Sequence, residues 1–249
     1  MELTVENLYK NYGQKVALKG VSFVLGQGVY GLLGPNGSGK STLMNILTGN
    51  VRATSGTVFW NGQNIAEMGK DYRKILGYVP QQQALYPDFT GMRFLSYIAT
   101  LQGLKSKEAK ERISYALDVV ELSHVSSKKI RSYSGGMKQR LLIAQAILTD
   151  PKVLIMDEPT AGLDPKQRVL MRNLIVEIAS DKVVLIATHV VSDIEWISKE
   201  ILLLKEGSLI QKGNRDLLIR SIQEKIETSS KRNKKNVDLE DIYLYYFGE

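Results

Sequence analysis

The segment GPNGSGKST, at residues 34–42, decides how the rest of this chain is interpreted. Its spacing, GxxxxGK[ST], lets backbone N–H groups of a glycine-rich turn point inward at phosphate oxygens. A helix that starts there turns the positive end of its dipole to the same anion. We expect Lys40 to reach the β- and γ-phosphates of a nucleotide and the Ser41 hydroxyl to bind Mg²⁺. The predicted phosphate-binding residues are Gly34, Pro35, Asn36, Gly37, Ser38, Gly39, Lys40, Ser41 and Thr42.

The residues around this loop supply the structural context that the motif requires. Residues 29–33 are apolar and predict a buried strand that runs into the loop. Residues 41–48 then predict a helix, and residues 58–60 a further strand that ends in an Asn-Gly turn. A glycine-rich turn with an incidental lysine does not require this order. The segment therefore predicts that the chain binds a nucleoside triphosphate.

A second motif, VLIMDE at residues 153–158, ends an apolar strand in two carboxylates. Ligands of open α/β folds bind at the carboxyl ends of the strands. We expect Asp157 to hold Mg²⁺, directly or through water, and Glu158 to polarise the water that attacks the phosphate. Solvated acids at a strand end would explain these two residues alone. Together with the loop, whose bound phosphates need a metal, they predict hydrolysis.

The pattern along the chain predicts one α/β unit interrupted by helices. Residues 91–150 repeat apolar positions at helical spacing and contain few strand signals, which indicates an inserted helical subdomain. Predicted strands at 153–156, 182–187 and 201–204 then alternate with helices at 167–179 and from about residue 192. EGSLIQKG, at residues 206–213, predicts a hairpin. This alternation favours a mostly parallel sheet covered on both faces.

Composition limits the class of protein further. The 249 residues are 43% hydrophobic and 24% charged, which is typical of a globular chain, and the absence of cysteine excludes disulfides and thiolate metal sites. The sequence has no apolar signal core and no run of roughly 18 apolar residues. We therefore expect a cytoplasmic protein that does not itself span a membrane. The net charge of +7 is partly due to KRNKK at residues 231–235, which we interpret as a solvated basic linker. This run belongs to a C-terminal extension, residues 216–249, whose end, DLEDIYLYYF, predicts a short amphipathic helix.

SYSGGMKQR, at residues 132–140, resembles the signature motif of ATP-binding-cassette (ABC) ATPases. Ser134, Gly135 and Gly136 correspond to the part of that motif that meets phosphate. Taken by itself, Ser134 also suits an ordinary helix N-cap. The family's usual spelling is LSGGQ, and the YSGGM spelling of this chain resembles exporters in particular.

The resemblance extends over about residues 1–215 and implies roles for further residues. Tyr12, in NYG, resembles the aromatic residue that stacks on adenine, although Tyr9 competes for this role. Gln81, in GYVPQ, resembles the glutamine that touches Mg²⁺ or the attacking water, with a shift to its glutamine neighbours left open. Asp164, in AGLD, resembles the loop at the dimer seam, and His189, in ATHVVSDIE, resembles the switch histidine that contacts the γ-phosphate.

The resemblance also implies a fold and partners. The fold is the α/β fold of P-loop NTPases, with a mostly parallel central sheet, N-terminal antiparallel strands and an inserted helical subdomain at about residues 91–150. Two chains pair head to tail, and the signature of each closes over the ATP and Mg²⁺ held by the other. LYPDFT, at residues 85–90, resembles the region that meets the membrane subunits, where Tyr86 and Phe89 suit a partner groove or core packing.

Three functions follow from these motifs. The first is the ATPase subunit of an ABC transporter, of the drug- or peptide-antibiotic-efflux kind, bound to separate membrane-spanning subunits at the inner face of the cell membrane. The second is a soluble ABC ATPase that acts on nucleic acid or the ribosome, which the net charge of +7 favours slightly. Such proteins usually have two cassettes in one chain or long coiled-coil insertions, and this sequence has neither, so we expect no nucleic-acid partner. The third is a regulatory cassette without turnover, which the presence of Glu158 and His189 opposes.

Overall fold

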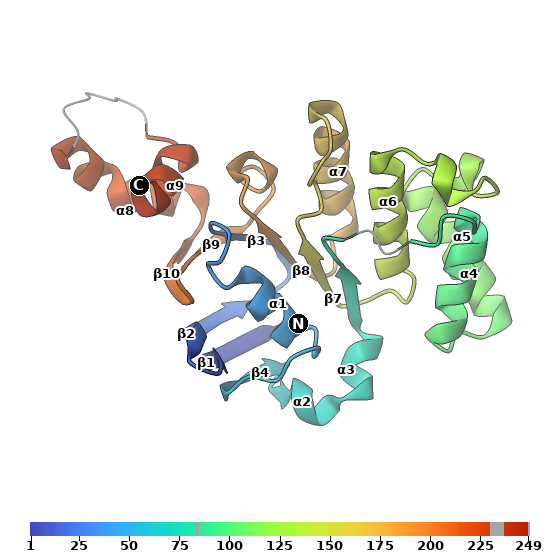
Figure 1. Cartoon of the computed structure of the whole chain (residues 1–249), viewed down its shortest axis with the longest axis horizontal. Helices are drawn as coiled ribbons and strands as arrows, with labels where there is room; N and C mark the ends of the chain where they lie inside the picture. Colours follow the sequence, from blue (N-terminus) through green and yellow to red (C-terminus); the bar gives the residue numbers. More distant parts are fainter. Residues whose placement is uncertain (83–84, 230–236, 249) are drawn as a thin grey trace.

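Two β-sheets form the body of the protein in a computed structural model that describes residues 1–82, 85–229 and 237–248 (Figure 1). The first sheet is antiparallel and has the strand order β2-β1-β4-β5. β1 pairs with β2 on one side and with β4 on the other, which agrees with the expected N-terminal antiparallel strands. Its strands are β1 (Leu3–Tyr12), β2 (Lys15–Leu25), β4 (Ser55–Trp60) and β5 (Gln63–Asn64).

The second sheet is mostly parallel, as the sequence predicts. Its order is β10-β9-β3-β8-β7-β6, and only β10 runs antiparallel to its neighbour. Every residue of β7 and β8 is buried, which explains their continuous apolar sequences. The strands are β3 (Gly28–Leu33), β6 (Leu76–Val79), β7 (Val153–Asp157), β8 (Val183–Thr188), β9 (Glu200–Lys205) and β10 (Ser208–Gly213).

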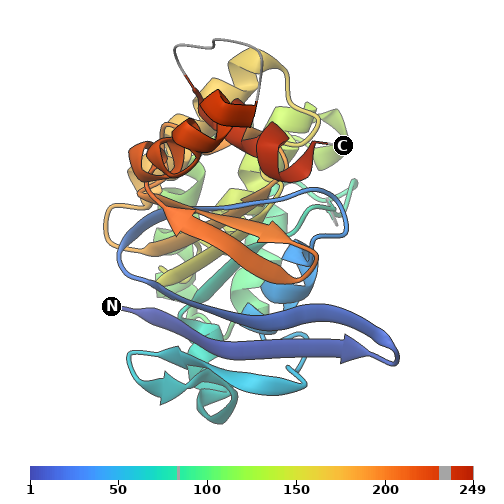
Figure 2. The same cartoon turned by 90° about the vertical axis from the view of Figure 1, so that its left-hand side faces the viewer.

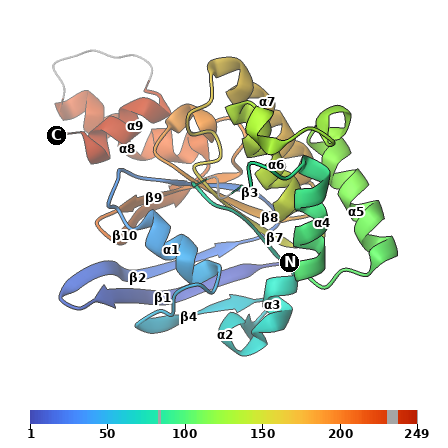
Figure 3. The same cartoon turned by 45° about the vertical axis from the view of Figure 1, so that its right-hand side comes forward.

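Helices cover both faces of the parallel sheet. α1 (Lys40–Leu47) lies between the two sheets (Figure 3) and packs with one set of alternating strand residues, such as Ile155 of β7. α7 (Pro165–Ile178) packs with the opposite set, such as Leu154. This division follows from the two-residue side-chain period of a strand. The short helices α2 (Ile65–Met68) and α3 (Lys70–Lys74) lead from β5 to β6.

Three helices form a bundle at one end of the molecule, as expected for residues 91–150 (Figure 1). They are α4 (Gly91–Leu101), α5 (Ser106–Val119) and α6 (Gly135–Ala146), with 3₁₀ turns at Ser123–Val125 and Ile130–Ser132.

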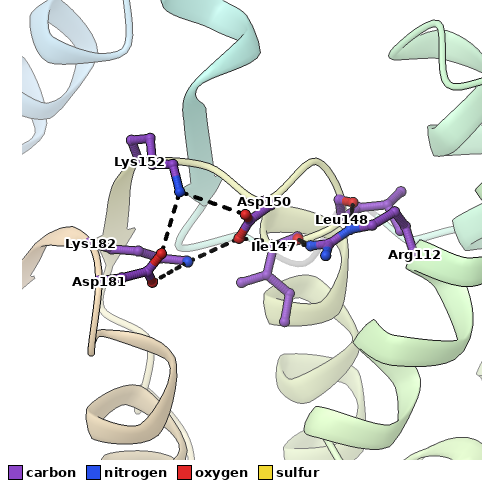
Figure 4. A network of polar contacts seen from close by, with 7 residues as sticks. All are labelled: Arg112, Ile147, Leu148, Asp150, Lys152, Asp181 and Lys182. Atoms are coloured by element: carbon purple, nitrogen blue, oxygen red, sulfur yellow. Dashed lines mark hydrogen bonds and ion pairs between the residues drawn. The ribbon is translucent and has the colours of Figure 1, made fainter. Parts of the chain in front are cut away.

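An ion-pair network ties this bundle to the parallel sheet (Figure 4). Asp150, which follows α6, accepts a hydrogen bond of 3.0 Å from the ammonium of Lys182, just before β8. The same ammonium lies 2.6 Å from a carboxylate oxygen of Asp181, and Lys152 lies 3.3 Å from the other oxygen of Asp181. Arg112 of α5 donates two hydrogen bonds of 2.9 Å to carbonyls at the end of α6. Helices α5 and α6 and the starts of two strands are thus joined through polar contacts.

The C-terminal residues add two helices that lie above the hairpin of β9 and β10 in Figure 2. α8 (Arg215–Ser229) and α9 (Leu239–Phe247) bury apolar residues in the same hydrophobic cluster as α7. α9 starts with a capping box, in which Asp238 accepts from the backbone N–H of Asp241 at 2.9 Å and Asp241 accepts from that of Asp238 at 3.0 Å. The amphipathic helix predicted there is confirmed, whereas the basic run 231–235 lies outside the described residues.

The prediction of a helix from about residue 192 is wrong. The helix predicted from about residue 192 is only a 3₁₀ turn, η3 (Val191–Asp193), followed by irregular turns. The carbonyl of Ser192 accepts from the Arg172 guanidinium at 2.5 Å instead of from the next helical turn. Thr160 likewise donates to the Asp193 carboxylate. Side chains from neighbouring elements therefore hold this segment in addition to its few turn-type backbone hydrogen bonds, such as the one of 3.0 Å from the Glu195 N–H to the Val191 carbonyl.

None of the helices in the described residues has both the length and the apolar composition that crossing a lipid bilayer requires.

Candidate nucleotide-binding site

A cavity of about 610 Å³ opens at the carboxyl end of the parallel sheet, between the loop before α1 and the tips of β1 and β2. Its position agrees with the general placement of ligand sites in α/β sheets. It brings together ten of the residues predicted from the sequence, namely Tyr12, Asn36, Gly37, Gly39, Lys40, Ser41, Thr42, Gln81, Asp157 and Glu158.

Lys40 is the buried cation of this cavity. It is the first residue of α1, and its ammonium donates to the carbonyls of Gly34 at 2.6 Å and Pro35 at 3.2 Å. Burial lowers the pKa of Lys40, while the charges of Glu158 and Asp157 oppose the shift. The cavity therefore holds a lysine close to two carboxylates at the N-terminus of α1, where the first backbone N–H groups of a helix have no intrahelical partner.

Gly39, which lines the cavity, is required by the shape of the loop. Gly39 has a φ of +109°, and a Cβ there would lie 2.8 Å from the carbonyl oxygen of Ala17. Only glycine tolerates both constraints. Gly34, Pro35 and Ser38 do not line the cavity, and the Ser38 hydroxyl is buried without a hydrogen-bond partner in the described part of the chain.

Two buried carboxylates lie at the end of β7. Asp157 and Glu158 are only 7% and 6% exposed, and Glu158 has a left-handed backbone with a φ of 50°. Burial, and after it the charge of Glu158, raises the pKa of Asp157, and the charge of Lys40 opposes this. A non-glycine residue at positive φ beside a like charge is the kind of strain that collects at functional sites.

The oxygen donors in the cavity suit Mg²⁺. Ser41 offers a hydroxyl, Gln81 an amide oxygen and Asp157 a carboxylate, all hard ligands. No group of three or more His, Cys, Asp or Glu residues that could hold a metal occurs in the described residues. That finding is compatible with Mg²⁺, which usually takes one or two carboxylates and completes its shell with phosphates and water.

His189 contacts the site indirectly, by a hydrogen bond to the carboxylate of Glu158. It follows β8, does not line the cavity, and has its Nδ1 2.8 Å from Oε1 of Glu158. The Thr188 hydroxyl donates to the other carboxylate oxygen at 3.3 Å. Sequence reasoning missed this contact. The signal was the parallel pairing of β7 with β8, which sets Asp157 opposite Ala187 and so brings the residues after them together.

The signature residues lie apart from the cavity. Ser134 caps α6 by accepting from the Met137 N–H at 3.2 Å, so the N-cap interpretation is correct for this chain alone. A Cβ on Gly135 would meet open space, whereas one on Gly136 would lie 2.5 Å from the Gln167 side chain of α7. Asp164 caps α7 by accepting from the Gln167 N–H at 2.9 Å. The structure thus places the predicted signature beside the start of α7 and outside the cavity.

Sequence reasoning also missed one acid that lines the cavity. Glu206 lies in the turn between β9 and β10, next to the wall formed by the tips of β1 and β2. The Glu-Gly pair marks a turn in the sequence, but nothing in the sequence indicates that this turn reaches the cavity.

Comparison with known proteins identifies the family. The model of the ABC transporter family matches residues 18–161, more than half of the chain. The chain belongs to the ABC transporter family. In Bacillus subtilis, the uncharacterized ABC transporter ATP-binding protein YxlF is 37% identical over 240 residues, which is 96% of this chain and 80% of that protein. The linearmycin resistance ATP-binding protein LnrL is also 37% identical, over 86% of this chain and 69% of LnrL.

Solved ABC structures agree. An ATP-binding subunit of an ABC transporter superposes with a TM-score of 0.83 and 28% identity, covering 98% of this chain and 99% of that one. The dimeric bacterial ABC transporter cassette MJ0796 superposes with a TM-score of 0.76 and 26% sequence identity, covering 85% of this chain and 98% of that one. This chain is therefore an ABC ATP-binding subunit that binds ATP with Mg²⁺ and hydrolyses ATP. The relatives named here are transport proteins, which does not support the nucleic-acid alternative.

Proposed function

We propose that this ATPase powers export through separate membrane-spanning subunits, at the cytoplasmic face of the cell membrane. Residues 1–215 would form the ATPase domain and residues 216–249 an extension. The direction rests on the names of relatives, which include LnrL and a Nod factor export ATP-binding protein I of Burkholderia orbicola, 37% identical over 86% of this chain. The YSGGM spelling of the signature supports the same direction.

In the proposed site, ATP lies along the cavity with its base on Tyr12 and its phosphates on the loop at residues 34–42. Ser41, Gln81 and Asp157 would hold Mg²⁺, which supplies charge neutralisation at the phosphates when bound. Glu158 would accept a hydrogen bond from the attacking water and orient it in line with the γ-phosphate.

His189 would hold Glu158 in position before it meets the γ-phosphate. Its contact of 2.8 Å and the Thr188 hydroxyl occupy both oxygens of the Glu158 carboxylate. A carboxylate fixed by two donors loses rotational freedom, so its acceptor lone pair is presented in one direction.

One observation carries the dimer that this mechanism needs. The N-terminus of α6, with Ser134 and the open space at Gly135, is an anion-binding element that its own cavity does not use. We infer that it closes over the ATP of a second chain. The dimeric MJ0796 cassette is consistent with this arrangement.

The test uses Glu158→Gln, which keeps the shape of the side chain and removes its charge. With ATP and Mg²⁺ the purified variant should form a stable dimer, measured by size-exclusion chromatography with light scattering. Adding Gly135→Glu to the same chain should return it to a monomer that still binds ATP. A dimer that survives this second change would refute the proposed role of the signature.

The surface beside Gln81 is the proposed contact with the membrane subunits. Tyr86 stacks on Phe89 with centroids 5.0 Å apart, Tyr97 meets both edge-on, and Tyr86 remains 47% exposed. Exposed aromatic clusters are common anchors of protein interfaces. Tyr86→Ala should reduce copurification with the membrane subunits and leave ATP binding unchanged; equal recovery with Tyr115→Ala, an exposed tyrosine of α5, would count against this contact.

A further inference from the structure

Glu206 occupies an unfavourable position for its residue type. It and Gly207 form the two-residue turn between β9 and β10, with φ angles of 48° and 81°. Hairpin turns with two positive φ angles favour Asn, Asp or Gly at the first position. A glutamate there is a local strain that calls for an explanation outside the turn.

The turn is fixed on both sides by backbone hydrogen bonds. The Gly207 carbonyl accepts from the N–H of Lys19 in β2 at 2.8 Å. The Gly207 N–H donates to the carbonyl of Ser38 in the phosphate-binding loop at 2.8 Å. A Cβ on Gly207 would lie only 2.6 Å from the carbonyl oxygen of Ala17, so the turn fits closely against β2. The position of Glu206 therefore follows from the same contacts that shape the cavity wall.

The side chain of Glu206 lines the nucleotide cavity and is exposed to it. In the described residues its carboxylate has no hydrogen-bond or ion-pair partner. A carboxylate only accepts hydrogen bonds, and it repels phosphate. Its counterpart on a bound nucleotide must be a donor outside the triphosphate.

The location selects the donor. The turn is bonded to Lys19 of β2, the strand whose first residue, Lys15, pairs with Tyr12 at the base end of the cavity, and to the loop that forms the phosphate end. The group between the base and the phosphates of ATP is the ribose, whose 2′- and 3′-hydroxyls are donors. We infer that Glu206 accepts hydrogen bonds from the ribose hydroxyls and selects ribonucleotides. The inference rests on the proposed orientation of ATP, with its base on Tyr12. Acidic residues bind ribose hydroxyls in the same way in dinucleotide-binding folds.

The test compares ATP with 2′,3′-dideoxy-ATP, which lacks both hydroxyls, by isothermal titration of the full chain with Mg²⁺. The wild-type chain should bind ATP about tenfold more tightly, as expected for a hydrogen bond to a charged acceptor. Glu206→Gly should bind both nucleotides with the affinity that the wild-type chain has for the dideoxy compound. Glycine accepts the left-handed backbone, so the turn should persist.

Glu121→Gly is the matched control. Glu121 is also an exposed glutamate with a φ of 55°, and it does not line the cavity. Its variant should keep the wild-type ratio of the two affinities. Equal affinities in the wild-type chain, or an equal loss for both nucleotides in Glu206→Gly, would overturn the ribose contact while leaving ATP binding intact. A wild-type chain that binds neither nucleotide would overturn the proposed site as well.

Discussion

The N-termini of α1 and α6 could each bind an anion, but the residues that surround the two N-termini differ. α1 begins at Lys40 inside the cavity, preceded by Gly39 and faced by two buried carboxylates. α6 begins after Ser134, which caps it. In the described residues, no part of α6 lines the nucleotide cavity. A helix dipole and free N–H groups are common to both. Lys40 and two buried carboxylates converge on the N-terminus of α1, whereas α6 has no such set in the described residues, and in the proposed mechanism α6 meets the phosphates held by a second chain.

Gly135→Glu tests this difference with the largest expected effect. The new side chain enters open space, and an acid in the first turn favours the helix, so the free energy of unfolding should not fall. A carboxylate where the second chain's phosphates would meet α6 should lower the ATPase rate by about 10²–10³-fold, the scale of losing a preorganised anion contact. Steady-state phosphate release and ATP titration of the monomer measure the two effects. A parallel loss of ATP affinity in the monomer would mean that α6 belongs to its own chain's site.

Lys40→Ala changes the N-terminus of α1 and should weaken ATP binding, the step that precedes hydrolysis. Removing the buried ammonium takes away a charge-assisted contact to the phosphates, so ATP affinity should fall about 100-fold. Lys110→Ala, on the exposed face of α5, is the control and should bind ATP normally. Isothermal titration gives both values. Unchanged affinity in Lys40→Ala would place the phosphates elsewhere in the cavity.

Sequence reasoning succeeded where chemistry and local pattern coincide. The loop, its flanking strand and helix, and the two acids after β7 lie near one another because parallel strands end at one edge of the sheet. The roles assigned to these residues remain predictions. The bundle of α4, α5 and α6 was also predictable, because its apolar positions recur at helical spacing.

Sequence reasoning failed where long-range contacts decide. The segment after His189 forms a 3₁₀ turn and irregular turns instead of the expected helix, and Arg172 and Thr160 bind its polar groups from α7 and from the turn after β7. The contact between His189 and Glu158 depends on strand register, and the reach of Glu206 depends on a hairpin docked on β2. No local pattern carries information about such pairs, which are separated by tens of residues.

The network of Figure 4 joins the end of α6 to the starts of β7 and β8, and Lys182 is its buried member. Its side chain is 8% exposed, and its hydrogen bond is the main cause that holds the pKa of Asp181 below its usual value. Lys182→Met leaves Asp150 and Asp181 without this partner. Because both aspartates are about half exposed, the expected loss is only about 1–2 kcal/mol of unfolding free energy.

Chemical denaturation at several pH values measures the Lys182 effect. Stability that comes from a depressed carboxyl pKa is present above the unfolded value of that pKa and is lost as the pH falls through the folded value. The gap between wild type and Lys182→Met should therefore narrow in acid. Lys152→Met, whose side chain is 38% exposed, should cost less than half as much. A gap that is independent of pH would assign the loss to packing instead of to charge.

The smallest expected effect concerns the repulsion between the carboxylates of Asp157 and Glu158 in the α1 site. Burial and the charge of Glu158 raise the pKa of Asp157, so ionised Asp157 destabilises the nucleotide-free fold above that pKa. Asp157→Asn should raise the melting temperature at pH 7 by about 2–4 °C, the shift that corresponds to about 1 kcal/mol in a chain of this size. The gain should shrink as the pH falls, because wild-type Asp157 then becomes neutral as well.

Asp164→Asn is the matched substitution beside the signature, at the N-cap of α7. Asparagine caps helices as well as aspartate does, and Asp164 is exposed, so the melting temperature of Asp164→Asn should stay near the wild-type value. Differential scanning calorimetry without nucleotide compares the two variants directly. If both gained equally, general relief of surface charge would explain the result. A gain confined to Asp157→Asn would show that the α1 site stores electrostatic strain which bound Mg²⁺ can offset, whereas the α6 end stores none and depends on its partner chain for charge.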